Sequence, residues 1–92
     1  MKVLVIFTTQ LKAALGIAQQ TLSLNEGSTV HQAIEALASQ YPDAFSRLVL
    51  DEEQNVLPSI VTCVNDQQVD LKRLEALHDG DTLTLLSAIS GG

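Results

Sequence analysis

The start of the chain constrains the fold most, because it has the pattern of a strand that is apolar on both of its faces. Residues 2–8 are rich in β-branched and aromatic side chains, which favour strands. In an extended chain, alternate residues point to opposite faces. One face would carry Val3, Val5 and Phe7, and the other would carry Leu4 and Ile6. Such a strand lies at the centre of a sheet or presents one apolar face to a partner.

A single stretch has the pattern of a long helix. Thr29 is a favourable N-cap residue, and Gln32 three positions later completes a capping box. Pro42 ends the helix, because a residue before proline avoids the helical conformation. Apolar residues recur at helical spacing between them and form one stripe of Val30, Ala33, Ile34, Leu37, Ala38 and Tyr41. We interpret this stripe as a face that packs into the core.

Three further stretches are predicted to be strands. Residues 19–24 alternate and would form a hairpin with the first strand, while residues 60–64 and 82–87 are short apolar strands. Val69 would return to the sheet briefly. A hairpin, then a helix, then further strands indicates an α+β fold, with a mixed sheet and one main helix packed across one face. If the first and last strands are central neighbours, residues 88–92 leave from the middle of the sheet.

The connections are predicted to be short and partly helical. Residues 9–16 can cover a sheet edge in one helical turn, and residues 71–77 form a short helical connector. Residues 43–59 are the least regular part and can pack as a short helix or as an extended piece. The expected organisation is a domain over residues 1–87 followed by a flexible tail over residues 88–92.

Composition and charge exclude several classes of protein. The chain has 92 residues and 46% hydrophobic content, which fits one globular domain. Its net charge is −6 and its five Lys and Arg residues are scattered, whereas nucleic-acid binding needs clustered basic residues. No apolar run approaches the length that spans a membrane. Cys63 is the one cysteine, which fits a reducing compartment. We therefore expect a cytoplasmic protein that binds neither nucleic acid nor a membrane.

No internal group of residues has the pattern of a catalytic or metal site. His31 and His78 lack a supporting nucleophile or ligand signature, and Cys63 lies in an apolar stretch where a free cysteine packs as a small hydrophobe. The acidic turn at residues 51–55 lacks the ligand spacing of a calcium loop, so we predict no metal. The remaining chemical feature is Ser90-Gly91-Gly92, a thin, mobile arm that can carry a terminal carboxylate into another protein's active site.

A terminal carboxylate reacts with sulfur only after activation. Joining it to AMP from ATP on a partner enzyme would make its carbonyl carbon an electrophile. Sulfide could then replace AMP and leave a thiocarboxylate at Gly92, whose ionised sulfur is a strong nucleophile. Because the sulfur is tethered to a folded domain, its effective concentration at an acceptor site is raised.

The order and spacing of several segments resemble the MoaD/ThiS sulfur-carrier family, the prokaryotic β-grasp relatives of ubiquitin. Each segment alone is a weak signal, but together they extend over nearly the whole chain. The segments are Lys2 to Val5 with Gln10 to Lys12, Gly27 to Val30, Val64 to Asp66, His78 to Asp81 and Ser90 to Gly92.

The resemblance implies a ubiquitin-like β-grasp fold and a carrier that is not itself an enzyme. It implies that Gly92 carries first an acyl-adenylate and then a thiocarboxylate. The partner-binding residues that it implies are Ser90, Gly91, Leu4, Ile6 and Leu86.

The resemblance also implies partners and several possible pathways. One partner would be an adenylating enzyme similar to ubiquitin-activating enzymes, which would use ATP, while the carrier itself would bind no cofactor. The other would be a sulfur acceptor such as the large subunit of molybdopterin synthase, in molybdenum cofactor biosynthesis. Residues 43–58 more resemble carriers that feed sulfur to cysteine synthesis, and thiamine synthesis and tRNA thiolation also remain open. A ubiquitin-like modifier of lysines and a plain β-grasp interaction module are the alternatives outside sulfur transfer.

Overall fold

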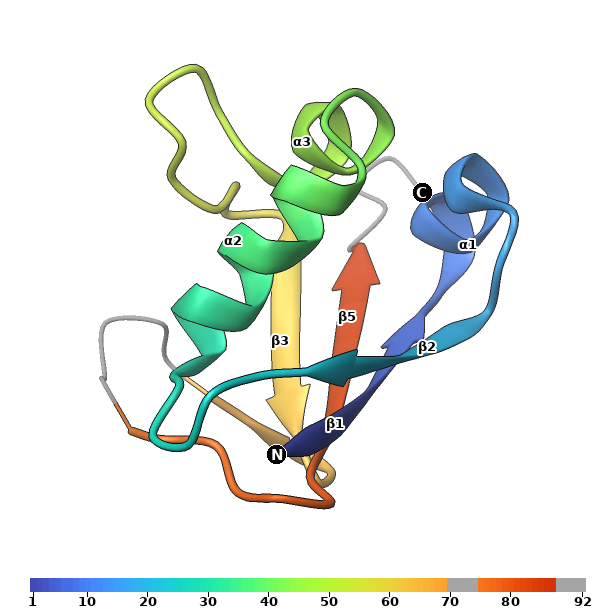
Figure 1. The fold of residues 1–92 in the computed structure, drawn as a ribbon. Helices are drawn as coiled ribbons and strands as arrows, with labels where there is room; N and C mark the ends of the chain where they lie inside the picture. Colours follow the sequence, from blue (N-terminus) through green and yellow to red (C-terminus); the bar gives the residue numbers. More distant parts are fainter. Residues whose placement is uncertain (70–74, 88–92) are drawn as a thin grey trace.

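The computed structural model describes residues 1–69 and 75–87 (Figure 1). Its strands are β1 (Lys2–Phe7), β2 (Gln19–Ser23), β3 (Ile60–Val64), β4 (Gln67–Gln68) and β5 (Thr82–Ser87). Its helices are α1 (Thr9–Leu15), α2 (Val30–Gln40) and α3 (Ala44–Val49). The expected arrangement of one main helix with a mixed sheet is confirmed, with two further, shorter helices, α1 and α3, of which α3 lies next to α2 (Figure 1).

The strands form one sheet in the order β2-β1-β5-β3-β4. Strands β1 and β5 run parallel, whereas the β1–β2, β3–β5 and β3–β4 pairs are antiparallel. Figure 1 shows β5 between β1 and β3. The first and last strands are therefore central neighbours, as the apolar density of both predicted.

The hydrophobic core lies between the sheet and α2, which crosses one face of it (Figure 1). The capping box of α2 is formed, because the Gln32 N–H donates to the Thr29 hydroxyl oxygen at 3.2 Å and the Thr29 N–H donates to the Gln32 side-chain oxygen at 2.8 Å. Fully buried side chains from both layers meet here, namely Val3, Val5, Ile34, Leu37, Leu83 and Leu85. The predicted stripe is thus a core face.

The connections differ in part from the expectation. Within residues 9–16, the helix α1 ends at Leu15, and Gly16 after it has a left-handed conformation at φ 75°. Within residues 43–59, α3 buries Phe45 completely. The predicted return to the sheet is made by β4, while Val69 follows it and donates its N–H to the Thr62 carbonyl at 2.9 Å.

The helical connector predicted over residues 71–77 is wrong in its described part. Residues 70–74 lie outside the described residues. Ala76 pairs with Thr29 in an antiparallel bridge, and the Leu77 N–H donates to the Ser28 carbonyl at 2.7 Å. This extended segment, which we call the strap, runs beside the residues that precede α2. Its Leu77 side chain is buried in the core.

One polar atom in the core has no partner. Thr62 on β3 is only 2% exposed, and no described group forms a hydrogen bond with its hydroxyl oxygen. Because a buried unsatisfied hydroxyl costs about 1–3 kcal/mol, we expect the isosteric Thr62→Val to raise the free energy of unfolding by about 1 kcal/mol. Urea denaturation measures this, with Thr21→Val at an exposed position of β2 as the control, and a less stable Thr62→Val would contradict it.

Candidate functional site

The second face of the sheet is partly accessible and apolar in its centre. In the strands β1, β3 and β5, the residues that alternate with the buried ones are half-buried or exposed. We call the uncharged members of this set the outer face, and they are Leu4, Ile6, Val61, Cys63, Thr82, Thr84 and Leu86. Lys2, the exposed first residue of β1, lies on the same side, where its ammonium group donates to the Ser23 hydroxyl oxygen at 3.1 Å. The outer face suits a partner surface that is apolar or weakly polar where it covers these seven residues.

Of the five partner-binding residues that the resemblance implies, Leu4, Ile6 and Leu86 lie on this same face. Across the strands, however, Leu4 is opposite Thr82 and Ile6 is opposite Thr84, whereas Leu86 is opposite Val61 on the other side of β5. Leu86 is 37% exposed and is the one large hydrophobic residue classed as exposed among residues 1–69 and 75–87.

The end of β5 is where the sheet meets the tail. Because β1 and β5 are parallel, their carboxyl ends lie at the same edge of the sheet, with Phe7 opposite Leu85. On the other side, Ser87 is opposite Ile60 at the start of β3. Ser90, Gly91 and Gly92 lie outside the described residues, so their predicted roles stay predictions.

Four members of the outer face were missed by reasoning from the sequence. Val61 and Cys63 on β3 are half-buried, and Cys63 lies opposite Thr84 in the row that continues to Ile6. Strand alternation assigns Val61 and Cys63 to one face, but Ile60 and Val64 on the other face are equally apolar. Only the register with β5 shows which set faces the core.

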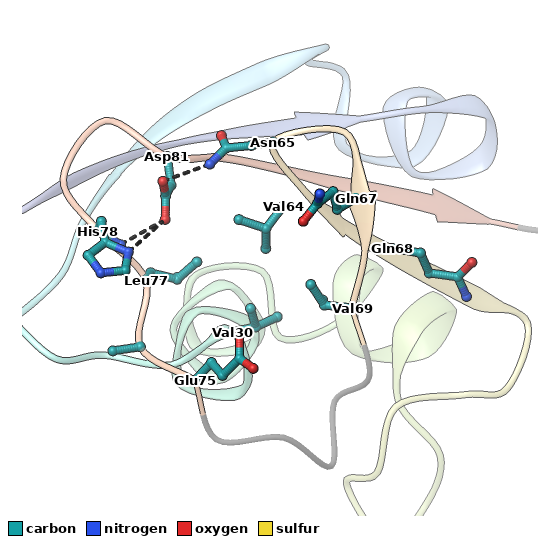
Figure 2. Close-up of a pocket in the computed structure, with 11 residues that line it drawn as sticks. Val30, Val64, Asn65, Gln67, Gln68, Val69, Glu75, Leu77, His78 and Asp81 are labelled. Carbon is teal, nitrogen blue, oxygen red and sulfur yellow. Dashed lines mark hydrogen bonds and ion pairs between the residues drawn. The ribbon is translucent and has the colours of Figure 1, made fainter.

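A second candidate location is a cavity of about 740 Å³ at the opposite end of the sheet (Figure 2). It lies between the β3–β4 hairpin, the first residue of α2 and the strap of residues 75–77. Figure 2 shows Val30, Val64, Val69 and Leu77 around this space, with the polar residues at its side.

The polar residues at this cavity link two of the family-like segments to each other. The Asn65 amide nitrogen donates to Asp81 Oδ1 at 2.8 Å, and the Asn65 oxygen accepts the Thr82 N–H at 2.9 Å. The His78 N–H donates to Asp81 Oδ2 at 2.8 Å (Figure 2). These bonds fix the entrance to β5, so Asn65 and Asp81 have a structural explanation.

The same hydrogen bonds make the stability of the fold depend on pH in the acidic range. The Asn65 amide, and after it the His78 N–H, hold the pKa of Asp81 below its ordinary value of 3.8. Because folding favours the carboxylate, its contribution is complete above pH 3.8 and is lost as the pH falls through the lowered pKa. We expect Asp81→Asn to be less stable than the unmodified chain at pH 7 and to lose less stability between pH 4 and pH 2.

Urea denaturation at several pH values measures this difference. Glu52→Gln removes the same charge from an exposed loop and serves as the control. If the free energy of unfolding of Asp81→Asn falls as steeply between pH 4 and pH 2 as that of the unmodified chain, the assignment to Asp81 is contradicted.

Other features give no catalytic or metal site among residues 1–69 and 75–87. His31 Nε2 lies 3.0 Å from Glu35 Oε1, one turn along α2, and both side chains are substantially exposed. No three His, Cys, Asp or Glu residues in the described part are grouped as metal ligands would be. No described helix is long and apolar enough to cross a membrane. The expectation of no metal stays a prediction.

Comparison with known proteins by sequence identifies the family. The ThiS family matches residues 5–92, a range that includes Gly92. A curated relative is the molybdopterin synthase sulfur carrier subunit of Chlamydomonas reinhardtii, which is 25% identical over 92 residues, with 100% of both chains covered.

Solved structures give the fold. The crystal structure of SAMP1 from Haloferax volcanii is similar with a TM-score of 0.90 and 24% identity over 100% of both chains. A chain in the crystal structure of the Amycolatopsis orientalis BexX/CysO complex has a TM-score of 0.69 and is 34% identical, with 98% of this chain and 99% of that chain covered. The expected ubiquitin-like β-grasp fold is thus confirmed. Because the family match covers nearly the whole sequence, the chain belongs to the ThiS family of ubiquitin-like sulfur carriers.

Proposed function

We propose that this chain carries sulfur as a thiocarboxylate on Gly92. The observation that supports this most is the position of β5, which runs between β1 and β3 and exposes Leu86 on the outer face. Residues 88–92 follow this strand directly in the sequence, and the family match continues through Gly92. A partner that covers Leu86 would therefore lie next to the point where the tail begins.

The length of the tail fits this arrangement. Five residues after Ser87 can span at most about 17 Å when fully extended. That reach is enough for Gly92 to enter an active site at the rim of a partner docked beside the end of β5. Docking on the outer face and delivery of the tail would thus be one event.

The proposed activation has two balanced steps on a partner enzyme. A Gly92 carboxylate oxygen forms a bond to the α-phosphorus of ATP, and the bond to pyrophosphate breaks. A sulfur nucleophile at the oxidation level of sulfide then attacks the acyl carbon, and AMP leaves with the bonding electron pair. The product is a thiocarboxylate, and the chain itself acts as the substrate of the adenylating enzyme.

Two acceptors are favoured by particular relatives. We propose first that the chain is the small subunit of molybdopterin synthase, in molybdenum cofactor biosynthesis, because its curated relative over the full length has that name. The second candidate is a carrier for cysteine synthesis, which the resemblance of residues 43–58 to such carriers supports, and a chain of the BexX/CysO complex is 34% identical to this one. Thiocarboxylated protein incubated with each acceptor enzyme and its substrate separates the two, because only the true acceptor returns the carrier to its carboxylate form.

Intact-mass measurement tests the carrier function itself. The chain is incubated with ATP, sulfide and the adenylating enzyme of its host. The expected result is a mass increase equal to the replacement of one oxygen by one sulfur, confined to the C-terminal peptide. If lysine conjugates form and the free chain keeps its mass, the modifier alternative replaces the proposal.

A further inference from the structure

The Thr8 hydroxyl makes a contact that its place in the chain would not predict. Thr8 is the N-cap residue of α1, where a threonine hydroxyl ordinarily accepts a backbone N–H of the first helical turn. Here the side chain makes no capping hydrogen bond, and the hydroxyl instead donates to the Leu85 carbonyl of β5 at 3.0 Å.

This contact is made despite two local costs. An N-cap side chain that does not cap its helix gives up the stabilisation that a capping hydrogen bond supplies. The next residue, Thr9, has φ 46°, a left-handed conformation that is strained for a β-branched side chain. The helix α1 is nevertheless held in place, because Leu11 is fully buried and α1 packs against α3 and β5.

The contact lies at the last point where β1 can hold β5. The parallel register ends with Phe7 opposite Leu85, because the chain turns into α1 at Thr8. Beyond it, Leu86 and Ser87 have partners on the β3 side, opposite Val61 and Ile60. The Thr8 hydroxyl therefore adds a hydrogen bond to β5 on the side that faces β1, immediately before Leu86.

We propose that Thr8 is a positioning residue for the activation of the tail, an inference that rests on the proposed sulfur-carrier function. By holding the Leu85 carbonyl, its hydroxyl fixes the β5 backbone immediately before Leu86 and Ser87. It thereby fixes the point on the sheet from which the tail is presented to the ATP of a partner docked on the outer face. Thr8 touches no reacting atom, so its effect is on the rate of adenylation in the docked complex and not on docking.

The experiment compares the unmodified chain with Thr8→Val and Thr8→Ser. Valine keeps the shape and removes the hydroxyl, whereas serine keeps the hydroxyl. The rate constant of pyrophosphate release is measured in single turnover at several carrier concentrations. We expect Thr8→Val to lower the saturating rate about tenfold or more with the half-saturating concentration unchanged within twofold, since small misplacements of a reacting group have such effects. Thr8→Ser is expected to restore the rate to within twofold.

A second measurement does not depend on any partner. In Thr8→Val, we expect the amide hydrogens of Leu86 and Ser87 to exchange with solvent about five- to tenfold faster, as loss of one hydrogen bond predicts, while those of Val5 and Leu37 stay unchanged.

The outcomes separate the two proposals. If the unmodified chain is not adenylated, the carrier function fails and the role of Thr8 fails with it. If it is adenylated and Thr8→Val has the same saturating rate, or alters only the half-saturating concentration, the role of Thr8 alone is overturned. Unchanged exchange at Leu86 and Ser87 would also overturn it, whereas a slow Thr8→Val that serine rescues supports it.

Discussion

Deletion of Gly92 is expected to abolish thiocarboxylate formation completely. The proposed reaction needs an unhindered glycine carboxylate at the end of a tail of fixed length, and the deletion moves the carboxylate about 3.5 Å back toward the sheet. A shift of that size removes the reacting atom from bonding distance of ATP. A misplacement of only about 1 Å can already lower a reaction rate about a hundredfold. Intact mass after incubation with ATP, sulfide and the adenylating enzyme would show no sulfur-containing product.

Two controls make this result specific. Gly91→Val keeps the length but adds a branched side chain to the arm, so we expect it to be activated at least tenfold more slowly. Both variants should unfold at the same temperature as the unmodified chain, because they leave every core residue of the described part of the chain unchanged. A carrier that still gains sulfur after loss of Gly92 would contradict the assignment of the reactive carboxyl group.

A charge on the outer face is expected to give the second large effect. Leu86→Asp places a carboxylate at the exposed apolar residue nearest to the tail. Burial of a leucine side chain at an interface is worth about 1.5–3 kcal/mol, and burial of an unpaired charge costs more. We therefore expect the half-saturating carrier concentration for adenylation to rise about 30-fold or more, with little change in the saturating rate.

Ala13→Asp is the matched control, because it adds the same charge to an exposed position of α1 that is not part of the outer face. Cys63 gives an independent measurement, since it lies on the outer face and its alkylation should be slowed when the adenylating enzyme is bound. Equal effects of Leu86→Asp and Ala13→Asp would mean that net charge and not the outer face governs binding. Unprotected Cys63 would place docking elsewhere.

Much of the fold could be predicted because its local signals agree with its global pattern. The capping box at Thr29 and Gln32 and the stop at Pro42 bound α2 to within about one residue of the helix observed. The alternation in the first strand separates Val5 from Leu4, and that in the last strand puts Leu83 and Leu85 on one side; the structure shows that Val5, Leu83 and Leu85 belong to the core. These features depend on neighbours in the sequence, which a single sequence contains.

The rest depends on contacts between distant residues. The strap at Ala76 and Leu77 has a helical composition, but its conformation is set by pairing with the residues before α2. The membership of Cys63 in the outer face follows from its register with Thr84. The hydroxyl of Thr8 would be read as a cap from the sequence alone, and only the approach of β5 gives it another acceptor.

The parallel pairing of β1 with β5 also has a consequence for synthesis of the chain. The two strands lie side by side in the middle of the sheet, yet Phe7 and Thr82 are separated by nearly the whole domain. A nascent chain emerging from the ribosome therefore cannot close its sheet until the last strand is released, because β5 supplies the contacts on both sides. A fragment that stops before Thr82 lacks the sheet centre and the complete outer face. Partner enzymes that bind this surface would thus discriminate finished molecules from abandoned translation products.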